Sequence, residues 1–441
     1  AIPGDISSVV AGTGLSGGGT SGDVTLNVDL ISKQAGTNFT NSVLVGTSST
    51  GTLNAAEGNT GVGISVLAAL TEGDNNVAVG MCSLLSNTTG SLNVGAGKNA
   101  LCDNTTGGSN TALGSNALRN NETAGNNTAV GNTALFTNTT GTQNTALGNA
   151  AMYANTTGGY SVAVGNNALQ GQTTGANNVA VGRTALAALT TGTRNTVVGG
   201  SYALGAGAAI TTGYHNVIVG NDAAGTMTEG HNNTVVGTEA LKVNTTGSDN
   251  VAIGTKALCT ATTSSSNVAV GRESMKLNTT GAQNTSVGTD SMVNGTTGCY
   301  NTALGACTLQ AVNTGCNNVA VGRKAMFDNT SGADNTAVGN DALADNTTGN
   351  KNTSIGINSL RNNTTGDCAV AIGVESLNKN TTGNQNVAVG RCALFCNTTG
   401  SNNIGIGNVA GSWGGGTPIA TGSENIFIGY AIGASSSSVA N

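Results

Sequence analysis

A glycine recurs with a 17-residue period through most of the chain, each time closing a phrase close to Asn-Thr-Ala-Val-Gly. A first run of this glycine extends from Gly46 to Gly199, a second run extends from Gly220 to Gly407, and a last copy is Gly429. The phrase Asn-Thr-Thr-Gly recurs between ten pairs of consecutive copies. So short a period, sustained over so many copies, is typical of a repeat architecture in which each unit packs only against its neighbours.

The repeat unit can be numbered from position 1 to position 17, starting at the first asparagine. It contains Asn, Thr or Val, Ala, an aliphatic residue, Gly, two variable residues, Ala or Ser, Leu or Met, two variable residues, Asn, Thr, Thr, Gly and two variable residues. Residues 144–160 are a typical copy. The unit lacks the three- and four-residue apolar spacing of an amphipathic helix. Its short apolar runs and its turns rich in Gly and Asn predict an all-β fold, a β-solenoid in which each coil is one 17-residue unit.

Stacking of such coils about 4.8 Å apart would align equivalent side chains in columns. We expect the aliphatic residue of position 4, such as Val79 and Leu147, and the Leu or Met of position 9, such as Leu84 and Met152, to point inward. We expect the recurrent asparagines to form amide ladders. The alanine of position 3 would then point outward, where a small side chain allows another chain to approach closely.

The expected core is thin. Each coil offers two or three medium aliphatic side chains, worth roughly 1.5–3 kcal/mol each when buried. Ordering the backbone costs roughly 1–2 kcal/mol per residue. A homotrimer wound on a common axis is therefore the predicted assembly, and a self-sufficient monomeric solenoid is the alternative.

The repeat divides the chain into three predicted parts. Residues 1–40 lack the unit and are expected to form a glycine-rich lead-in of a turn and a strand. Residues 41–433 carry the solenoid. Residues 434–441 are expected to be the trailing end of a longer chain.

Two steps of the repeat are longer than all the others. The extra residues fall within Gly200–Ile210 and within Gly411–Ala420, and the second segment contains Trp413, the only tryptophan. Insertions in solenoids map to loops. Both segments are therefore candidate surface loops, either for binding or as tolerated bulges.

The chain has nine cysteines, and their spacings do not match a zinc site. Cys299 and Cys316 differ from the others because they share one unit position in consecutive repeats. The solenoid therefore places them side by side on adjacent coils. In an oxidising compartment they are candidates for an intrachain disulfide, worth roughly 3 kcal/mol on the chain-entropy model.

Charge and motifs argue against several function classes. The net charge is −6 and no basic patch carries interleaved aromatic residues, so nucleic acid is not an expected partner. No apolar run reaches the length of a membrane span. His215 and His231 occupy neighbouring positions on adjacent coils, but the repeat places no carboxylate with them, so we predict no metal site. No catalytic set and no cofactor site is predicted, and the protein is not expected to be an enzyme.

The Asn-Thr-Thr phrase also matches the rule for N-glycosylation, for example at Asn87 and Asn155. A structural turn explains the same sequence without a glycan. Both interpretations stay open at this stage.

Two families share these phrases. The segment VAGTGLSGGGTSGDVTL at residues 10–26 and the alternation of NTAVG, AL and NTTG resemble tail-fibre and related appendage proteins of bacteriophages. The repeats are also similar to the heads of trimeric autotransporter adhesins, although the adhesin unit is shorter. Both resemblances imply an extracellular, homotrimeric β-fibre without enzymatic activity.

The resemblance implies a structural fibre shaft of a phage virion, which presents a host-recognition tip. Its implied partners are other copies of the chain and other virion tail or fibre proteins, and a host surface glycan or protein is a candidate. The alternative is a trimeric adhesin or a self-assembling filament at the cell surface. An ice-binding solenoid that uses its threonine columns is a third hypothesis.

Overall fold

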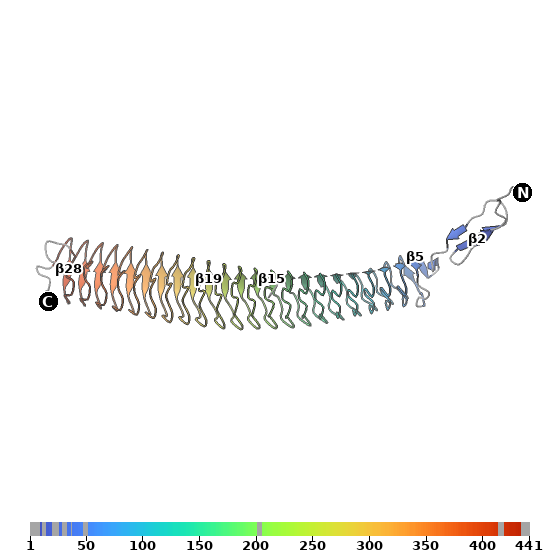
Figure 1. Ribbon diagram of the computed structural model, residues 1–441, viewed down its shortest axis with the longest axis horizontal. Helices are drawn as coiled ribbons and strands as arrows, with labels where there is room; N and C mark the ends of the chain where they lie inside the picture. Colours follow the sequence, from blue (N-terminus) through green and yellow to red (C-terminus); the bar gives the residue numbers. More distant parts are fainter. Residues whose placement is uncertain are drawn as a thin grey trace. The chain divides into compact units, whose positions relative to one another are not determined.

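The computed structural model describes residues 9–10, 15–19, 26–28, 33–36, 38–46, 52–200, 205–412 and 419–433. The structure is all-β and repeats one coil about every 17 residues, which confirms the predicted β-solenoid (Figure 1). The chain forms two compact units, residues 1–191 and 192–441, and each is described by itself.

The first unit begins with antiparallel strands and continues as a parallel stack. Strands β1 (Val9–Val10), β2 (Leu15–Gly19) and β3 (Leu26–Val28) form an antiparallel sheet, and β4 (Lys33–Gly36) pairs antiparallel with β5 (Phe39–Val45). From β5 onward the pairing is parallel. The further strands of this unit are β6 (Ala56–Glu57), β7 (Thr60–Val62), β8 (Val77–Val79), β9 (Val94–Ala96), β10 (Thr111–Leu113), β11 (Thr128–Val130), β12 (Thr145–Leu147), β13 (Val162–Val164) and β14 (Val179–Val181).

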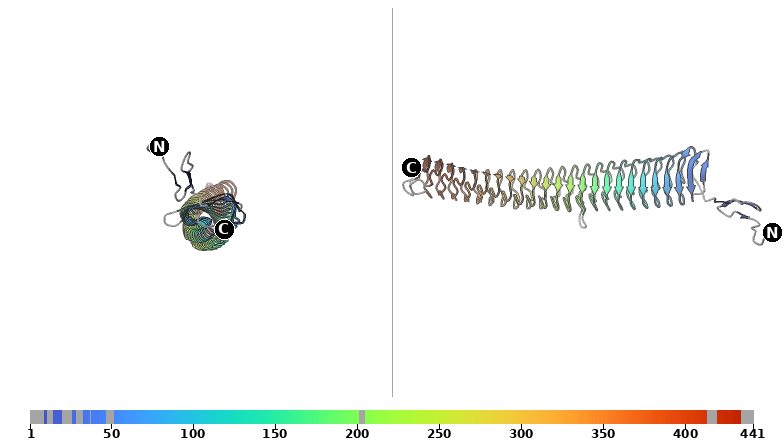
Figure 2. Two further views of the ribbon diagram at one scale, coloured as in Figure 1. Left: turned by 90° about the vertical axis from the view of Figure 1, so that its right-hand side faces the viewer. Right: turned by 90° about the horizontal axis from the view of Figure 1, so that it is seen from above.

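The second unit is a parallel stack of three-residue strands, one per coil. They are β15 (Thr196–Val198), β16 (Val217–Val219), β17 (Thr234–Val236), β18 (Val251–Ile253), β19 (Val268–Val270), β20 (Thr285–Val287), β21 (Thr302–Leu304), β22 (Val319–Val321), β23 (Thr336–Val338), β24 (Thr353–Ile355), β25 (Val370–Ile372), β26 (Val387–Val389), β27 (Ile404–Ile406) and β28 (Ile426–Ile428). Equivalent residues pair directly, for example Ala303 with Ala320. Figure 2 shows the strands following one another in the stack. No residue is shifted out of register between these strands.

The asparagine of position 1, which other residues such as Ser161 and Ala369 replace in a few coils, is buried and links its coil to the next. The side-chain Oδ1 of Asn59 accepts the backbone N–H of Asn76 at 3.0 Å. Its Nδ2 donates to the carbonyl of Gly73 at 2.9 Å, at the end of the same coil. This pattern repeats along the stack and survives the longest steps, since Asn425 N donates to Asn403 Oδ1 at 3.0 Å. The predicted amide ladder is confirmed.

A second ladder runs through position 12, the asparagine of Asn-Thr-Thr-Gly. Nδ2 of Asn104 donates to Oδ1 of Asn87 at 2.7 Å and to the carbonyl of Gly107 at 3.0 Å. The side chains of Asn87, Asn104 and Asn155 are fully buried. Because a glycan on this amide would displace it from the ladder, the folded coil does not accommodate N-glycosylation at these asparagines.

The rest of this turn is held by one carbonyl. The backbone N–H groups of Thr88, Thr89 and Gly90 all donate to the carbonyl of Thr105 on the next coil, at 2.9, 3.3 and 3.4 Å. A Cβ atom on Gly90 would collide with the carbonyl oxygen of Gly107. The glycine of Asn-Thr-Thr-Gly is therefore required for close approach between coils.

The orientation predicted for positions 3 and 4 is wrong. The alanines of position 3, such as Ala78 and Ala146, are fully buried, while Val79 and Leu147 of position 4 are 42% and 39% exposed. The prediction placed the bulkier side chain inside. The Leu or Met of position 9, which is buried as predicted, already fills that space, so only a small residue fits beneath it. Where position 9 shrinks to Ala224, position 3 of the same coil grows to Ile218.

The two insertion segments are only partly at the surface. Gly200 and Ala420 are exposed, as expected for loops, but Ile210 and Gly411 are buried. Ile210 occupies position 12 of its coil, and Gly411 occupies position 9, where a Cβ atom would press against the ring of Phe427. Ile210 follows the extra residues of its segment and Gly411 precedes those of the other segment, so both keep their places in the repeat and belong to the core. Residues 201–204 and Trp413 lie outside the described residues.

Replacing Asn127 by Asp tests the amide ladder. The change is isosteric, but it puts a charge at a fully buried site and removes the Nδ2 donor to Gly141. We expect a loss of about 3 kcal/mol of unfolding free energy at neutral pH, measured by urea denaturation. Asn126→Asp, at the adjacent exposed position, should change the stability by less than about 0.5 kcal/mol. Equal effects of the two substitutions would contradict the ladder.

A second pair of substitutions tests the orientation of the strand. Ala146→Leu should destabilise the isolated chain by about 1–3 kcal/mol because it overpacks the interior. Leu147→Ala, one residue away on the exposed side, should have a much smaller effect on the same thermal unfolding curve. The opposite ranking would restore the orientation predicted from the sequence.

Candidate interaction surface

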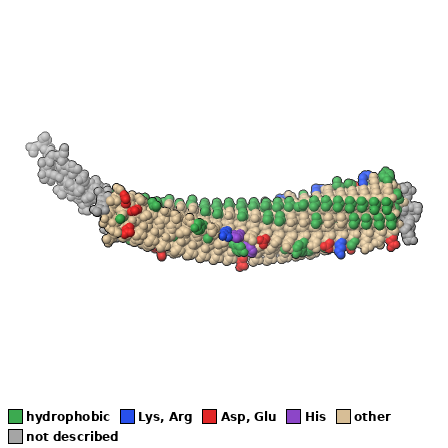
Figure 3. All heavy atoms as spheres, turned by 180° about the vertical axis from the view of Figure 1, so that it is seen from behind, with side chains coloured by type: hydrophobic (Ala, Val, Ile, Leu, Met, Phe, Trp, Pro, Cys, Tyr) green, Lys and Arg blue, Asp and Glu red, His purple; other side chains and the backbone are tan. Residues whose placement is uncertain are grey.

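Positions 2 and 4 of the strands point outward and form two adjacent columns, here called the aliphatic stripe. Position 2 is Val, Thr or Ile and position 4 is Val, Leu or Ile in strands β7–β28, apart from Ala96. None of these positions carries a charged residue. Many of the side chains are more than a third exposed, among them Val79 at 42% and Ile355 at 40%. Figure 3 shows the resulting band of hydrophobic side chains along the strands.

The size of the stripe sets it apart from scattered surface hydrophobic residues. With strands about 4.8 Å apart and alternate residues about 7 Å apart, each coil contributes roughly 35 Å². The fourteen strands β15–β28 then present on the order of 500 Å². The strands β7–β14 of the first unit, taken by themselves, present about half as much. Contiguous apolar patches of this size mark interaction sites in soluble proteins.

The edge of the stripe is polar in most coils, although exposed apolar residues such as Ile64 and Ile357 take its place in a few. Position 6, which follows the glycine of the strand phrase, is Asn, Thr or Arg in many coils, and the arginines are Arg183, Arg272, Arg323 and Arg391. The threonines of position 6 in the second unit, Thr238, Thr255 and Thr289, are neighbours of charged residues at position 7. An apolar centre with a polar rim is the usual composition of a protein–protein interface.

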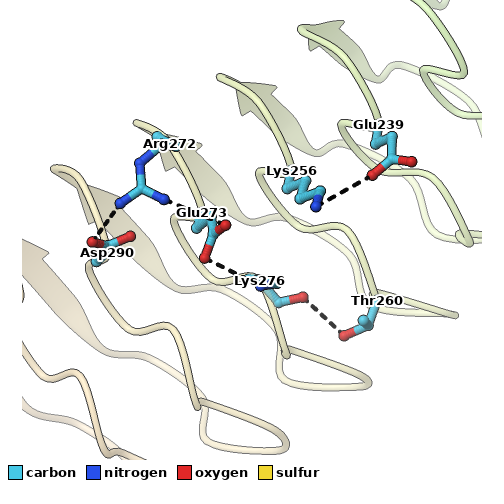
Figure 4. Close-up of polar contacts among 7 residues, drawn as sticks. All are labelled: Glu239, Lys256, Thr260, Arg272, Glu273, Lys276 and Asp290. Carbon is cyan, nitrogen blue, oxygen red and sulfur yellow. Dashed lines mark hydrogen bonds and ion pairs between the residues drawn. The ribbon is translucent and has the colours of Figure 1, made fainter.

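A network of ion pairs lies beside this edge in the second unit (Figure 4). Arg272 contacts Asp290 at 2.7 Å and Glu273 at 3.4 Å, and Glu273 contacts Lys276 at 3.1 Å. The hydrogen bond from Lys276 lowers the pKa of Glu273. Glu239 pairs likewise with Lys242 and Lys256. All these groups are partly exposed, so each pair contributes little to stability. Because positive and negative side chains alternate in the network, its net charge is small.

The predicted adjacency of Cys299 and Cys316 is confirmed. Their sulfur atoms lie 2.9 Å apart, and Cys316 Sγ also accepts the backbone N–H of Cys299 at 3.2 Å. Both cysteines are free thiols. The hydrogen bond between the thiols, with partial burial, raises the pKa of Cys299 to about 11. The disulfide itself stays a prediction.

The two histidines belong to an aromatic cluster. The ring of Tyr214 stacks on His231 at 4.7 Å between centroids and meets His215 edge-on at 5.2 Å. Arg194 Nη1 donates to His215 Nε2 at 3.2 Å, and Ser248 Oγ lies 2.9 Å from His231 Nδ1. Each imidazole thus has a polar side chain within hydrogen-bond distance of one ring nitrogen. Within the described ranges, no three His, Cys, Asp or Glu side chains are grouped as metal ligands.

Two shallow hollows contain titratable groups. One, of about 350 Å³, is lined by Asp334, Asn350, Lys351, Asp367 and Cys368. Another, of about 330 Å³, is lined by Glu375, Arg391, Cys392, Phe395 and Val409.

The chemistry of the second hollow does not favour catalysis. Burial, together with the hydrogen bond to Glu375, raises the pKa of the Cys392 thiol. This thiol is therefore protonated at neutral pH and is a weak nucleophile. The aliphatic stripe remains the strongest candidate for a functional surface.

Comparison with known proteins does not assign a family. No protein-family model matches the chain, and a search of curated proteins finds no similar sequence. In the part of the chain that the structure describes, no helix is long and apolar enough to cross a membrane.

Sequence reasoning missed the stripe. Its signal was present, because both position 2 and position 4 flank an alanine and are β-branched or aliphatic in nearly every coil. The face that is exposed, either position 3 or positions 2 and 4, is known only once it is known which of these positions is buried.

Proposed function

We propose that the protein is the structural shaft of a virion fibre, a tail fibre or similar phage appendage, in which several copies of the chain associate through the aliphatic stripe. The observation that carries the proposal is this charge-free stripe, which runs along coil after coil and which an isolated chain exposes. A stack of equivalent coils adds a fixed rise per unit. Such an element spans distance without catalytic groups, which suits a shaft.

A second copy of the chain is the partner that the stripe fits best. A parallel copy has the same 17-residue period and the same spacing between strands, so each aliphatic residue meets an equivalent one. The exposed area, on the order of 800 Å² per chain, equals what one partner buries in a standard interface. Three copies around a common axis would cover all three stripes together, which supports a homotrimer.

The stripe replaces the alanine column as the proposed contact. Ala146 and Ala163 are fully buried inside their own coils and do not reach a neighbouring chain. The β-branched residues of positions 2 and 4 favour the extended backbone and, in an assembly, would form a dry layer between sheets.

Charged substitutions in the stripe test the assembly. Ile253→Glu together with Val287→Glu introduces carboxylates at position 4 of two coils, where burial between copies would leave them unpaired. We expect the variant to associate more than tenfold more weakly than the wild type, measured by mass photometry and sedimentation over a range of concentrations. Far-UV circular dichroism should stay unchanged.

The matched control is Thr255→Glu with Thr289→Glu, at position 6 of the same coils, where both threonines are exposed. The control should assemble like the wild type. A wild-type chain that stays monomeric at micromolar concentration, or a stripe variant that assembles normally, would show that the stripe is not the contact.

The proposed role in a virion is tested by determining where the protein is found, on virus particles or on cells. Antibodies against the chain should label appendages of particles purified from the culture that carries the gene, as seen by immunogold electron microscopy. Label confined to cell envelopes, with unlabelled particles, would contradict the virion role and favour the adhesin.

A further inference from the structure

Cys299 and Cys316 are the one place in the described solenoid where two thiols meet on the same unit position of consecutive coils. The sulfur atoms are 2.9 Å apart, and Asn317 N donates to the carbonyl of Cys299 at 3.1 Å, which fixes the backbones at this point. Equivalent residues of adjacent coils are about 4.8 Å apart, inside the range of Cα separations that a disulfide spans. Both side chains are partly exposed, so a reagent can reach them.

The two coils that carry these thiols also lack part of the usual stabilisation. Position 12 is Gly295 in the first coil and Val312 in the second, so the second amide ladder is interrupted there. Asn278 and Asn329, on either side of the gap, each keep the bond to the glycine of their own turn, at 2.9 and 3.0 Å. Where consecutive coils both carry the asparagine, its side chain also donates to the preceding coil, as Asn346 does to Asn329 at 2.7 Å. The ladder is likewise interrupted at Leu189, Ile210, Met227 and Ala261, but no pair of stacked cysteines lies there.

The first ladder continues through the gap. Asn318 N donates to Asn301 Oδ1 at 3.0 Å, so the coils stay stacked in register. The missing link is therefore confined to the turn of positions 11–15, directly before position 16, where the thiols lie.

We propose that Cys299 and Cys316 are an oxidative modification site, at which a small-molecule disulfide or a thiol–disulfide oxidoreductase forms an intrachain disulfide that ties two consecutive coils across the gap in the amide ladder. The bond supplies a covalent link between coils where the side-chain link of position 12 is absent. This inference is independent of the virion role, because it depends only on the two coils and an oxidant.

The exchange proceeds in two balanced steps when glutathione disulfide is the oxidant. One cysteine loses its proton, and its thiolate attacks a glutathione sulfur, so that a protein–glutathione disulfide forms and a glutathione thiolate leaves. The second cysteine, also deprotonated, attacks the protein sulfur of that bond and expels the second glutathione thiolate. The two protein thiols are oxidised by two electrons, glutathione disulfide is reduced to two thiols, and the two protons end on glutathione.

The reaction should be slow at neutral pH. The pKa of Cys299 is raised to about 11 by the hydrogen bond to Cys316 and by partial burial, so little thiolate exists at pH 7. The neighbours at positions 16 and 17 are Ala282, Gln283, Tyr300, Asn317, Ala333 and Asp334. Asp334 is the one acid among them, its carboxylate accepts a hydrogen bond from Asn317 at 3.1 Å, and its negative charge disfavours a nearby thiolate. The oxidation rate should therefore rise steeply between pH 7 and pH 9, by roughly tenfold per pH unit while the thiolate is the minor form.

The experiment uses the full chain with every other cysteine replaced by serine. After incubation with glutathione disulfide the protein is alkylated, denatured and cut with chymotrypsin, which cleaves after Tyr300 between the two cysteines. We expect the fragments that carry Cys299 and Cys316 to stay joined until a reductant is added, and oxidation to raise the midpoint of thermal unfolding. Circular dichroism before oxidation reports whether the variant that keeps only Cys299 and Cys316 is folded.

A matched control moves one thiol by one coil. Cys316→Ser combined with Ala333→Cys keeps two cysteines at position 16 but separates them by two coils, and this pair should stay reduced under the same conditions. Full alkylation of Cys299 and Cys316 after exposure to the oxidant at pH 9, in the folded protein, would overturn the proposal. So would a crosslink found only between chains on a non-reducing gel.

Discussion

The amide side chain of position 1 is the interaction on which the rest of the structure depends. It accepts a backbone N–H from one neighbouring coil and donates to a carbonyl within its own coil, so it fixes both the shape of a coil and its register on the next. A buried amide without these partners would cost on the order of 1–3 kcal/mol, which makes any shift of register expensive. The bond from Asn216 N to Asn195 Oδ1, at 3.1 Å, is kept across a step of 21 residues. Extra residues are thus accommodated without breaking the ladder.

The period, the coil and the columns could be predicted from the sequence because they follow from spacing alone. Residues one period apart stack on adjacent coils whatever their chemistry, so the adjacency of Cys299 and Cys316 needed no knowledge of side-chain direction. The ladders followed from the same spacing and from the ability of asparagine to donate and accept at once. Leu84 and Met152 were correctly placed inside because each lies in the largest apolar column of its coil.

The direction of the strand side chains could not be predicted by the same means. The sequence of a three-residue strand shows that its side chains alternate, but it does not show which of them point inward. That depends on how much space the Leu or Met of position 9 leaves in the interior. The turn around that residue is unusual, since Leu84 has φ +50° and Cys82 has φ +58°, a left-handed conformation that non-glycine residues seldom adopt. Two such residues so close together curl the chain and bring position 9 under position 3. The sequence pattern does not predict this backbone conformation. For that reason alanine, and not valine, was expected on the exposed face of the strand.

The ladders have a consequence for how the gene can change. Because a coil with both asparagines makes the same bonds to the coil before and after it, removal or duplication of one such unit rejoins the ladders with equivalent partners. Recombination between near-identical repeats would therefore alter the number of coils while leaving each remaining coil folded as before. The number of coils can therefore change in steps of one unit. An insertion of any other length requires the chain to return to the repeat within one coil, as it does at Ile210 and Ile419, which are buried at position 12.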